Sequence, residues 1–179
     1  MRKLSYEEIT ARRLNRQEIQ RAERFPIITL LDNIRSLHNV GSIFRTADAV
    51  RLKKLYLCGI TGNPPRKEID KTALGAVDTV PWEYREDAVQ LVKELKQEGV
   101  QMVALEHTSE SRPFDRIDIR FPVCLVVGNE VFGIQDKIVE LADTAVEIPM
   151  YGTKQSLNVT IAYGIVIYRL LDQFLAQNK

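Results

Sequence analysis

The sequence predicts an α/β fold in which helices flank a mostly parallel sheet. Short apolar runs of strand length alternate along the chain with longer segments of helical spacing, and this alternation is typical of parallel sheets. Three of these runs end in a polar, glycine-containing turn, and loops in that position often hold a ligand. With 179 residues and 45% hydrophobic content, the chain can bury one substantial core, so one main domain is expected.

The expected elements follow in order along this domain. Strands are expected near Ile27–Leu31, Lys54–Cys58, Val100–Leu105, Val123–Val127 and Ala145–Ile148. Helices are expected at Val40–Val50, Arg85–Gln97, Gln135–Leu141 and Leu157–Leu175. Gly99 supplies a stop signal for the second of these helices. The stretch Thr61–Lys67 is basic and rich in turn residues, so it is interpreted as a mobile surface loop near the functional edge of the sheet.

The segment from Ile148 to Thr160 is the most informative part of the chain. A strand end passes through a polar loop into a long apolar helix, and Ser156 is expected to be the N-cap with Asn158 in the first turn. Free backbone N–H groups at such a helix start can receive a polar ligand. The alternative is that Ser156 only caps the helix and Asn158 only bonds a neighbouring loop.

Two further turns carry polar groups after a strand. In the first, Asn39 is expected to cap a helix, Gly41 permits close backbone approach, and Arg45 follows about a turn and a half later, where it could face an anionic ligand. In the second, Gly128 and Gly133 bracket a turn that contains the carboxylate of Glu130. All three polar turns are therefore expected at the ends of strands.

Other nucleotide-binding signatures fail when they are tested by residue. The turn Gly128–Gly133 has the glycine spacing of a P-loop, but Ile134 and Gln135 occupy the positions of the required Lys and Ser/Thr. No G-x-G-x-x-G follows a predicted strand, which argues against an ordinary dinucleotide site. A nucleoside triphosphatase and a Rossmann-type methyltransferase are therefore disfavoured.

The cysteines and histidines give no sign of a metal site or a disulfide. Cys58 and Cys124 lie in apolar runs, where buried free thiols are common, and His38 and His107 have no closely spaced Cys/His partners. We expect no metal. No stretch approaches the apolar length of a signal sequence or a membrane span, so no membrane association is expected and the cytoplasm is the expected compartment.

Together, the three polar turns resemble the sequence motifs of the SpoU family, also called the TrmH family, of RNA ribose 2′-O-methyltransferases. The resemblance spans roughly Ile27 to Tyr168 and includes the order of the motifs and the residues inside each. It implies a deep C-terminal trefoil knot of the SPOUT, or α/β-knot, type and a homodimer whose subunits together form the RNA site. The functional positions that it implies are Asn39, Arg45, Glu130, Ser156 and Asn158.

The resemblance also implies that S-adenosylmethionine is the cofactor, held in a bent form largely by backbone groups of three loops. The implied cofactor contacts are Leu105, Gly128, Ile148, Met150, Ser156 and Leu157. Arg45 is the expected key residue, because its guanidinium can bind a phosphate and stabilise negative charge on the 2′-oxygen. Its alternatives are a literal base, opposed by its very high ordinary pKa, or a surface ion pair.

The other polar residues also have alternative roles. Glu130 is expected to orient Arg45 or Asn39, and its alternatives are to accept the proton or to cap its own turn. Asn39 and Asn158 are expected to hold the loops and the ribose in register, or else to serve only as helix-start residues. The expected substrate is tRNA, with ribosomal RNA as the alternative. Two further alternatives are an enzyme that methylates a base and a non-catalytic knotted protein that serves as an RNA-binding or assembly factor.

Residues 1–25 form a basic N-terminal extension that precedes the methyltransferase domain at 26–179. They carry seven Lys or Arg and four Asp or Glu, a local net charge of +3, whereas the remaining residues have a net charge of −2. A helix from Tyr6 to Arg24 is expected to place arginines on RNA phosphates. Those arginines are Arg12, Arg13, Arg16, Arg21 and Arg24. The alternative is a solvated helix that packs Ile9 and Ile19 inward.

Overall fold

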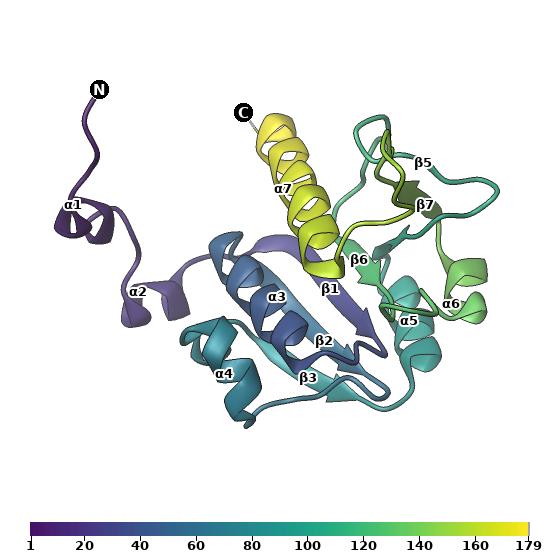
Figure 1. Cartoon of the computed structure of the whole chain (residues 1–179), viewed down its shortest axis with the longest axis horizontal. Coiled ribbons are helices and arrows are strands. Elements are labelled where there is room, and N and C mark those ends of the chain that lie inside the picture. The colour runs from purple at the N-terminus through teal and green to yellow at the C-terminus, as the bar shows by residue number, and fades with distance from the viewer. Residues whose placement is uncertain (179) are drawn as a thin grey trace.

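The computed structural model describes residues 1–178 and shows one parallel sheet with helices on both faces (Figure 1). The sheet has seven strands in the order β3-β2-β1-β6-β4-β7-β5, and every neighbouring pair is parallel. Their bounds are β1 Phe25–Asp32, β2 Leu52–Cys58, β3 Trp82–Arg85, β4 Gln101–Leu105, β5 Arg112–Pro113, β6 Val123–Val127 and β7 Thr144–Glu147. The predicted α/β class and parallel sheet are confirmed.

The helices of the domain cover both faces of the sheet, so the core has two parts. They are α3 Leu37–Ala49, α4 Lys67–Ala73, a short 3-10 turn at Ala76–Asp78, α5 Ala88–Gln97, α6 Asp136–Leu141 and α7 Val159–Gln177. On one face, Phe44 of α3 and Tyr163 of α7 pack against β1 residues such as Ile27. On the other, Leu91 of α5 and Ile138 of α6 pack against Cys124 and its neighbours. Alternate residues of each central strand thus serve opposite faces.

Several expected boundaries are corrected by the structure. Arg85 was assigned to a helix but ends β3, and α5 starts at Ala88 with Asp87 as its N-cap. The strands β3 and β5 and the helix α4 are not among the expected elements, because they are short or contain few apolar residues. The supposed loop Thr61–Lys67 is fixed at both ends, because Thr61 is buried and Lys67 begins α4.

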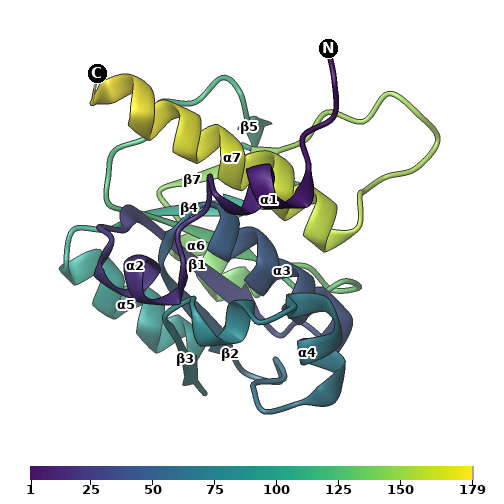
Figure 2. The ribbon, with the colours of Figure 1, turned by 90° about the vertical axis from the view of Figure 1, so that its left-hand side faces the viewer.

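The N-terminal extension is two short helices rather than one long helix. They are α1 Tyr6–Thr10 and α2 Arg16–Arg21, each started by its own capping box, with Ser5 and Asn15 as the caps. Ile19 packs inward, whereas Ile9 is 37% exposed, so the alternative of inward packing is correct for Ile19 and wrong for Ile9. Figure 1 shows α1 standing away from the domain, and Figure 2 shows the molecule from the side on which α1 and α2 lie.

The long helix α7 is also hydrogen-bonded to the irregular segment at residues 115–119. The side chains of Arg169, Gln173 and Gln177 donate to the carbonyl oxygens of Asp115, Ile117 and Ile119 at 3.3, 2.7 and 3.0 Å. A step of four residues along a helix rises about 6 Å, which nearly matches two residues of extended chain. The helix therefore replaces a neighbouring strand as the hydrogen-bonding partner of this segment.

One face of α7 packs in the core and another is exposed. Tyr163, Val166, Ile167 and Leu170 are buried against the sheet, whereas four large apolar side chains face outward. The exposed ones are Ile161, Ile165, Tyr168 and Leu175. Contrary to the expectation from sequence, α7 is long and apolar enough by length and composition to cross a membrane.

Candidate active site

A cavity opens where the carboxyl ends of β4, β6 and β7 meet the start of α7. Parallel strands bring the loops that follow them to one edge of the sheet, which is where α/β folds bind ligands. The cavity has a volume of about 480 Å³, within the range of small-molecule sites. It is lined by Leu105–His107, Val127–Val131, Gly133, Val146–Ile148, Met150, Ser156–Val159 and Ala162.

All six residues named as cofactor contacts lie on the wall of this cavity. Leu105 is the last residue of β4, Gly128 follows β6, Ile148 and Met150 follow β7, and Ser156 and Leu157 precede α7. Four of the six have apolar side chains that suit an adenosine group, and the cavity is large enough to hold one. The residues present therefore fit the cofactor, although the individual contacts remain predictions.

The turn after β6 depends on its two glycines. A Cβ atom at Gly128 would overlap the backbone of Gly133 and Ile134, and Gly133 has a left-handed φ of 70°. The backbones of Asn129 and Gly133 bond each other at 3.0 and 2.9 Å, which closes the turn. Gly41, by contrast, permits close contact between α3 and α4, because a Cβ there would overlap Thr72 and the carbonyl of Ile69.

The structure corrects both predicted helix caps. Ser36 caps α3 by accepting from the N–H of Asn39 at 3.3 Å, so Asn39 lies inside the first turn. Asn158 caps α7, since its Oδ1 accepts from the N–H of Thr160 at 2.9 Å. Ser156 is an exposed loop residue two positions earlier. In both cases the N-cap is a different polar residue from the predicted one, because several polar residues near each helix start can serve as the cap.

The Glu130 carboxylate holds the turn from Arg35 to Asn39 in place. It accepts from the N–H groups of Arg35 and Ser36 at 3.0 and 3.1 Å, and from the side-chain amide of Asn39 at 2.8 Å. Partial burial raises the pKa of Glu130, but these hydrogen bonds outweigh burial and hold its pKa below the ordinary value. Glu130 therefore orients Asn39 and not Arg45.

The loop that leads into α7 reaches the same group of residues. The side-chain amide of Asn158 donates to Oδ1 of Asn39 at 3.4 Å. Asn39, Glu130 and Asn158 come from three distant parts of the chain, yet they form one series of polar contacts beside the cavity. The three motifs are thus brought together in space.

Arg45 is not part of this cluster within one chain. It is exposed on α3, it is absent from the cavity wall, and no hydrogen bond or ion pair among residues 1–178 holds its guanidinium. Among residues 1–178, Arg45 therefore does not form the surface ion pair that was the alternative to a functional role. If Arg45 acts on the bound substrate, another molecule must bring the two together.

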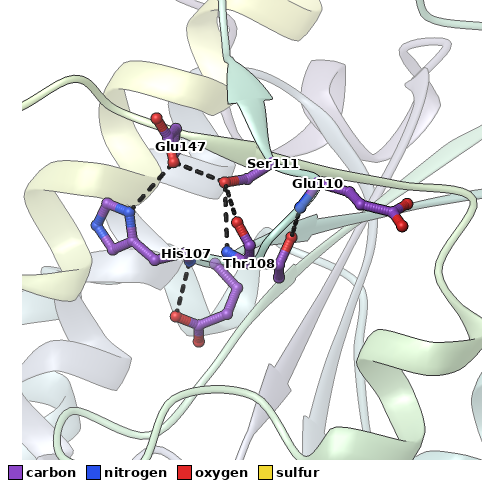
Figure 3. A network of polar contacts seen from close by, with 6 residues as sticks. His107, Thr108, Glu110, Ser111 and Glu147 are labelled. Atoms are coloured by element: carbon purple, nitrogen blue, oxygen red, sulfur yellow. Dashed lines mark hydrogen bonds and ion pairs between the residues drawn. The ribbon is translucent and has the colours of Figure 1, made fainter.

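A second polar cluster lies at the rim of the cavity and was missed in the sequence (Figure 3). The carboxylate of Glu147 lies 2.6 Å from the Ser111 hydroxyl and 3.4 Å from Nδ1 of His107. Hydrogen bonds from Ser111 and then His107 lower the pKa of Glu147. The polar run directly after β4 was the available signal, but the approach of Glu147 from β7 could not be read from it.

The two cysteines lie in the core. Cys58 and Cys124 are buried free thiols, and burial raises the pKa of Cys58 to about 12 and raises that of Cys124 as well. Thiols in this state are poor nucleophiles. The expectation that both are structural and unpaired is confirmed.

Comparisons with known proteins agree with the geometry of the site. Residues 26–168 match the SpoU rRNA Methylase family. A tRNA (guanosine(18)-2′-O)-methyltransferase of Aquifex aeolicus is 38% identical over 166 residues, which cover 92% of this chain and 78% of that enzyme.

Solved structures show the same relationship. The crystal structure of the A. aeolicus TrmH/SpoU tRNA modifying enzyme aligns with a TM-score of 0.81 and 35% identity over 90% of this chain and 85% of that one. An AdoMet-bound rRNA methyltransferase from Sinorhizobium meliloti aligns with a TM-score of 0.76 and 30% identity over 84% and 58%. The trefoil knot is typical of such folds and stays a prediction here.

The family match covers most of the chain, and its motifs meet at one cavity. The chain therefore belongs to the SpoU rRNA Methylase family and is an S-adenosylmethionine-dependent RNA 2′-O-methyltransferase.

Proposed function

We propose that this enzyme methylates a ribose 2′-hydroxyl of tRNA and that it does so as a homodimer. The observation that carries the proposal is the joining of Asn39, Glu130 and Asn158 beside the cofactor cavity. The tRNA assignment is supported by the A. aeolicus relative, whose name gives tRNA as its substrate and most of whose length is matched.

Methyl transfer requires in-line approach of the ribose oxygen and removal of its proton, so positioning and charge stabilisation supply most of the catalysis. The bound cofactor supplies the methyl group on a sulfonium. Asn39 and Asn158 hold the ribose in register, and Glu130 keeps Asn39 in place. We assign Glu130 to orienting Asn39 and not to accepting the proton, since its carboxylate already accepts three N–H donors.

Arg45 binds a phosphate of the RNA and stabilises negative charge on the 2′-oxygen. Its planar, permanently charged guanidinium suits both tasks. Because Arg45 lies outside the cavity of its own chain, we assign it to the cavity of a partner subunit. The active site is then complete only in the dimer.

The outward face of α7 is the proposed dimer surface. Ile161, Ile165 and Tyr168 are 54%, 36% and 51% exposed, and they continue the helix face that starts at the cavity. Rows of exposed apolar side chains this large mark protein contacts. Because α7 also packs on α3, a partner that covers α7 lies near the helix that carries Arg45.

The N-terminal extension is proposed to contact RNA, with fewer arginines than the sequence suggested. Arg24 donates to the carbonyls of Leu52 and Thr79, and Arg16 pairs with Asp78, so both have structural partners. Arg12 and Arg13 lie exposed between α1 and α2. We assign the phosphate contacts to these two and to Arg21, and we place the enzyme in the cytoplasm.

Ribosomal RNA is the second candidate substrate, since the similar S. meliloti enzyme is an rRNA methyltransferase. The test is methyl transfer from labelled S-adenosylmethionine to tRNA and to ribosomal RNA, each prepared without modifications. We expect tRNA to be methylated with a kcat/KM at least about a hundredfold higher, the scale of one well-made set of specific contacts. Preferential labelling of ribosomal RNA would contradict the tRNA assignment.

A further inference from the structure

The loop that carries Glu130 is anchored at its far end by a buried acid at the end of β1. Asp32 is fully buried, and its Oδ2 accepts from the backbone N–H of Gln135 at 2.8 Å. Its Oδ1 accepts from the side-chain amide of Gln135 at 2.6 Å and from that of Asn33 at 2.8 Å. A buried carboxylate with three hydrogen-bond donors is held firmly, because the loss of one donor leaves part of the buried negative charge without a partner.

Asn33 extends this anchor to two other loops. It has a left-handed φ of 58°, its Oδ1 accepts from the N–H of Ile60 at 3.0 Å, and its carbonyl accepts from the side chain of Asn129 at 2.7 Å. The side-chain oxygen of Asn129 in turn accepts from the N–H groups of Val131 and Phe132 within the same loop. The loop from Gly128 to Gln135 is thus tied to β1 at both of its ends.

Glu130 lies between these two ties, and it is the group that holds the N–H groups of Arg35 and Ser36 and the amide of Asn39. We propose that Asp32 and Gln135 are positioning residues for methyl transfer, which act by fixing the place of Glu130 and, through it, Asn39. Neither residue touches the cavity, so neither is a catalytic residue. The kinetic test of this proposal depends on the proposed methyl-transfer activity, whereas the structural test does not.

The structural test is amide hydrogen exchange in Gln135→Ala, in which the backbone bond to Asp32 is retained and only the side-chain bond is lost. We expect the exchange of the Arg35 and Ser36 amides to become about tenfold faster, since their acceptor Glu130 is no longer held in place. Asp136→Asn, a change of an exposed acid one residue away, is the control and is expected to leave both amides protected. Unchanged protection in a folded Gln135→Ala would overturn the proposal whatever the RNA substrate.

The kinetic test is a double-mutant cycle with Glu130→Gln. Gln135→Ala and Asp32→Asn are each expected to lower kcat about tenfold, with little change in the KM for cofactor, because small misplacement of a positioned group is costly. In the Glu130→Gln background, Gln135→Ala is expected to cause no further loss. Equal losses in both backgrounds would show that Gln135 does not act through Glu130. If Asp32→Asn does not fold, Gln135→Ala alone decides the result.

Discussion

At the scale of single residues, the cluster of Asn39, Glu130 and Asn158 depends on an ionised Glu130. Its carboxylate accepts N–H donors from Arg35, Ser36 and Asn39, and these bonds weaken when it is protonated. Because its pKa is lowered in the folded state, Glu130 adds stability that is present above its ordinary value of 4.5 and lost as the pH falls through the lower, folded value.

We therefore expect Glu130→Gln to lower the free energy of unfolding by about 1 kcal/mol at pH 7. The difference from wild type should shrink as the pH falls below 4.5. Denaturant titrations at a series of pH values measure both quantities. Glu140→Gln, at an exposed site on α6, is the control. A difference that stays constant or grows in acid would show that the carboxylate charge is not what holds the motif.

Arg45 is the residue whose loss should affect chemistry without affecting cofactor binding. We expect Arg45→Ala to lower kcat for methyl transfer at least a hundredfold, the usual scale for one charge-stabilising donor. The Kd of the cofactor should be unchanged, since the proposed partners of Arg45 are an RNA phosphate and the ribose 2′-oxygen and not the cofactor. Single-turnover kinetics and calorimetry check the two parts. Normal transfer by the variant would refute the role of Arg45.

Arg45→Lys separates charge from shape. It keeps the positive charge but loses the planar, bidentate donor group. We expect its activity to lie between those of wild type and Arg45→Ala. Activity equal to that of wild type would mean that charge alone is needed.

At the scale of elements, α7 stabilises the segment at residues 115–119, which lies outside the strands of the sheet. Gln173 donates to the carbonyl of Ile117 at 2.7 Å. We expect Gln173→Ala to destabilise the fold by about 1 kcal/mol, because a part-buried acceptor loses its donor. Chemical denaturation measures this, with Gln155→Ala in the exposed loop before α7 as the control. Equal stability of the two variants would show that the contact contributes nothing.

The N-terminal extension makes a separate prediction about RNA. Replacing Arg12 and Arg13 together with Ala should weaken RNA binding and reduce the slope of log affinity against log salt by about one to two. The pair has no partner to lose in the described chain, so the fold should be unaffected. Binding titrations across a salt series provide the measurement. An unchanged slope would leave the extension as a solvated surface segment.

The sequence predicted the central elements well but not the edges. β1, β2, β4 and β6 are apolar over most of their length, and the positions of these strands and of β7 agree with prediction to within about two residues. β3 alternates Trp82 and Tyr84 with charged residues, so Arg85 was attached to the next helix. The two capping boxes at Ser5–Glu8 and Asn15–Glu18 were readable signals for two N-terminal helices, and they were overlooked.

The site was predictable only through the family motifs. Local pattern could place Asn39, Glu130 and Asn158 after strands, but it could not pair residues that are 91 and 119 positions apart. The caps were misassigned because Ser36 and Asn158 compete with nearby polar residues. The anchor at Asp32 was invisible, since a buried acid is identified by the donors that surround it and not by its neighbours in sequence.

At the scale of the whole molecule, the proposed homodimer has active sites to which both chains contribute. Mixing Arg45→Ala with Asn158→Ala tests this, because a mixed dimer has one cavity with both an intact Asn158 and an intact Arg45 from the partner. Random exchange in an equal mixture should restore about a quarter of wild-type activity. No recovery would place Arg45 and Asn158 of one chain in the same site.

The most direct test of the whole account is the identity of the methylated product. Purified enzyme is incubated with labelled S-adenosylmethionine and unmodified tRNA, and the tRNA is digested to nucleosides for mass spectrometry. We predict a single labelled product with the methyl group on the ribose 2′-oxygen. A methyl group on a base, or cofactor binding with no transfer to any RNA, would contradict the function assigned to this site.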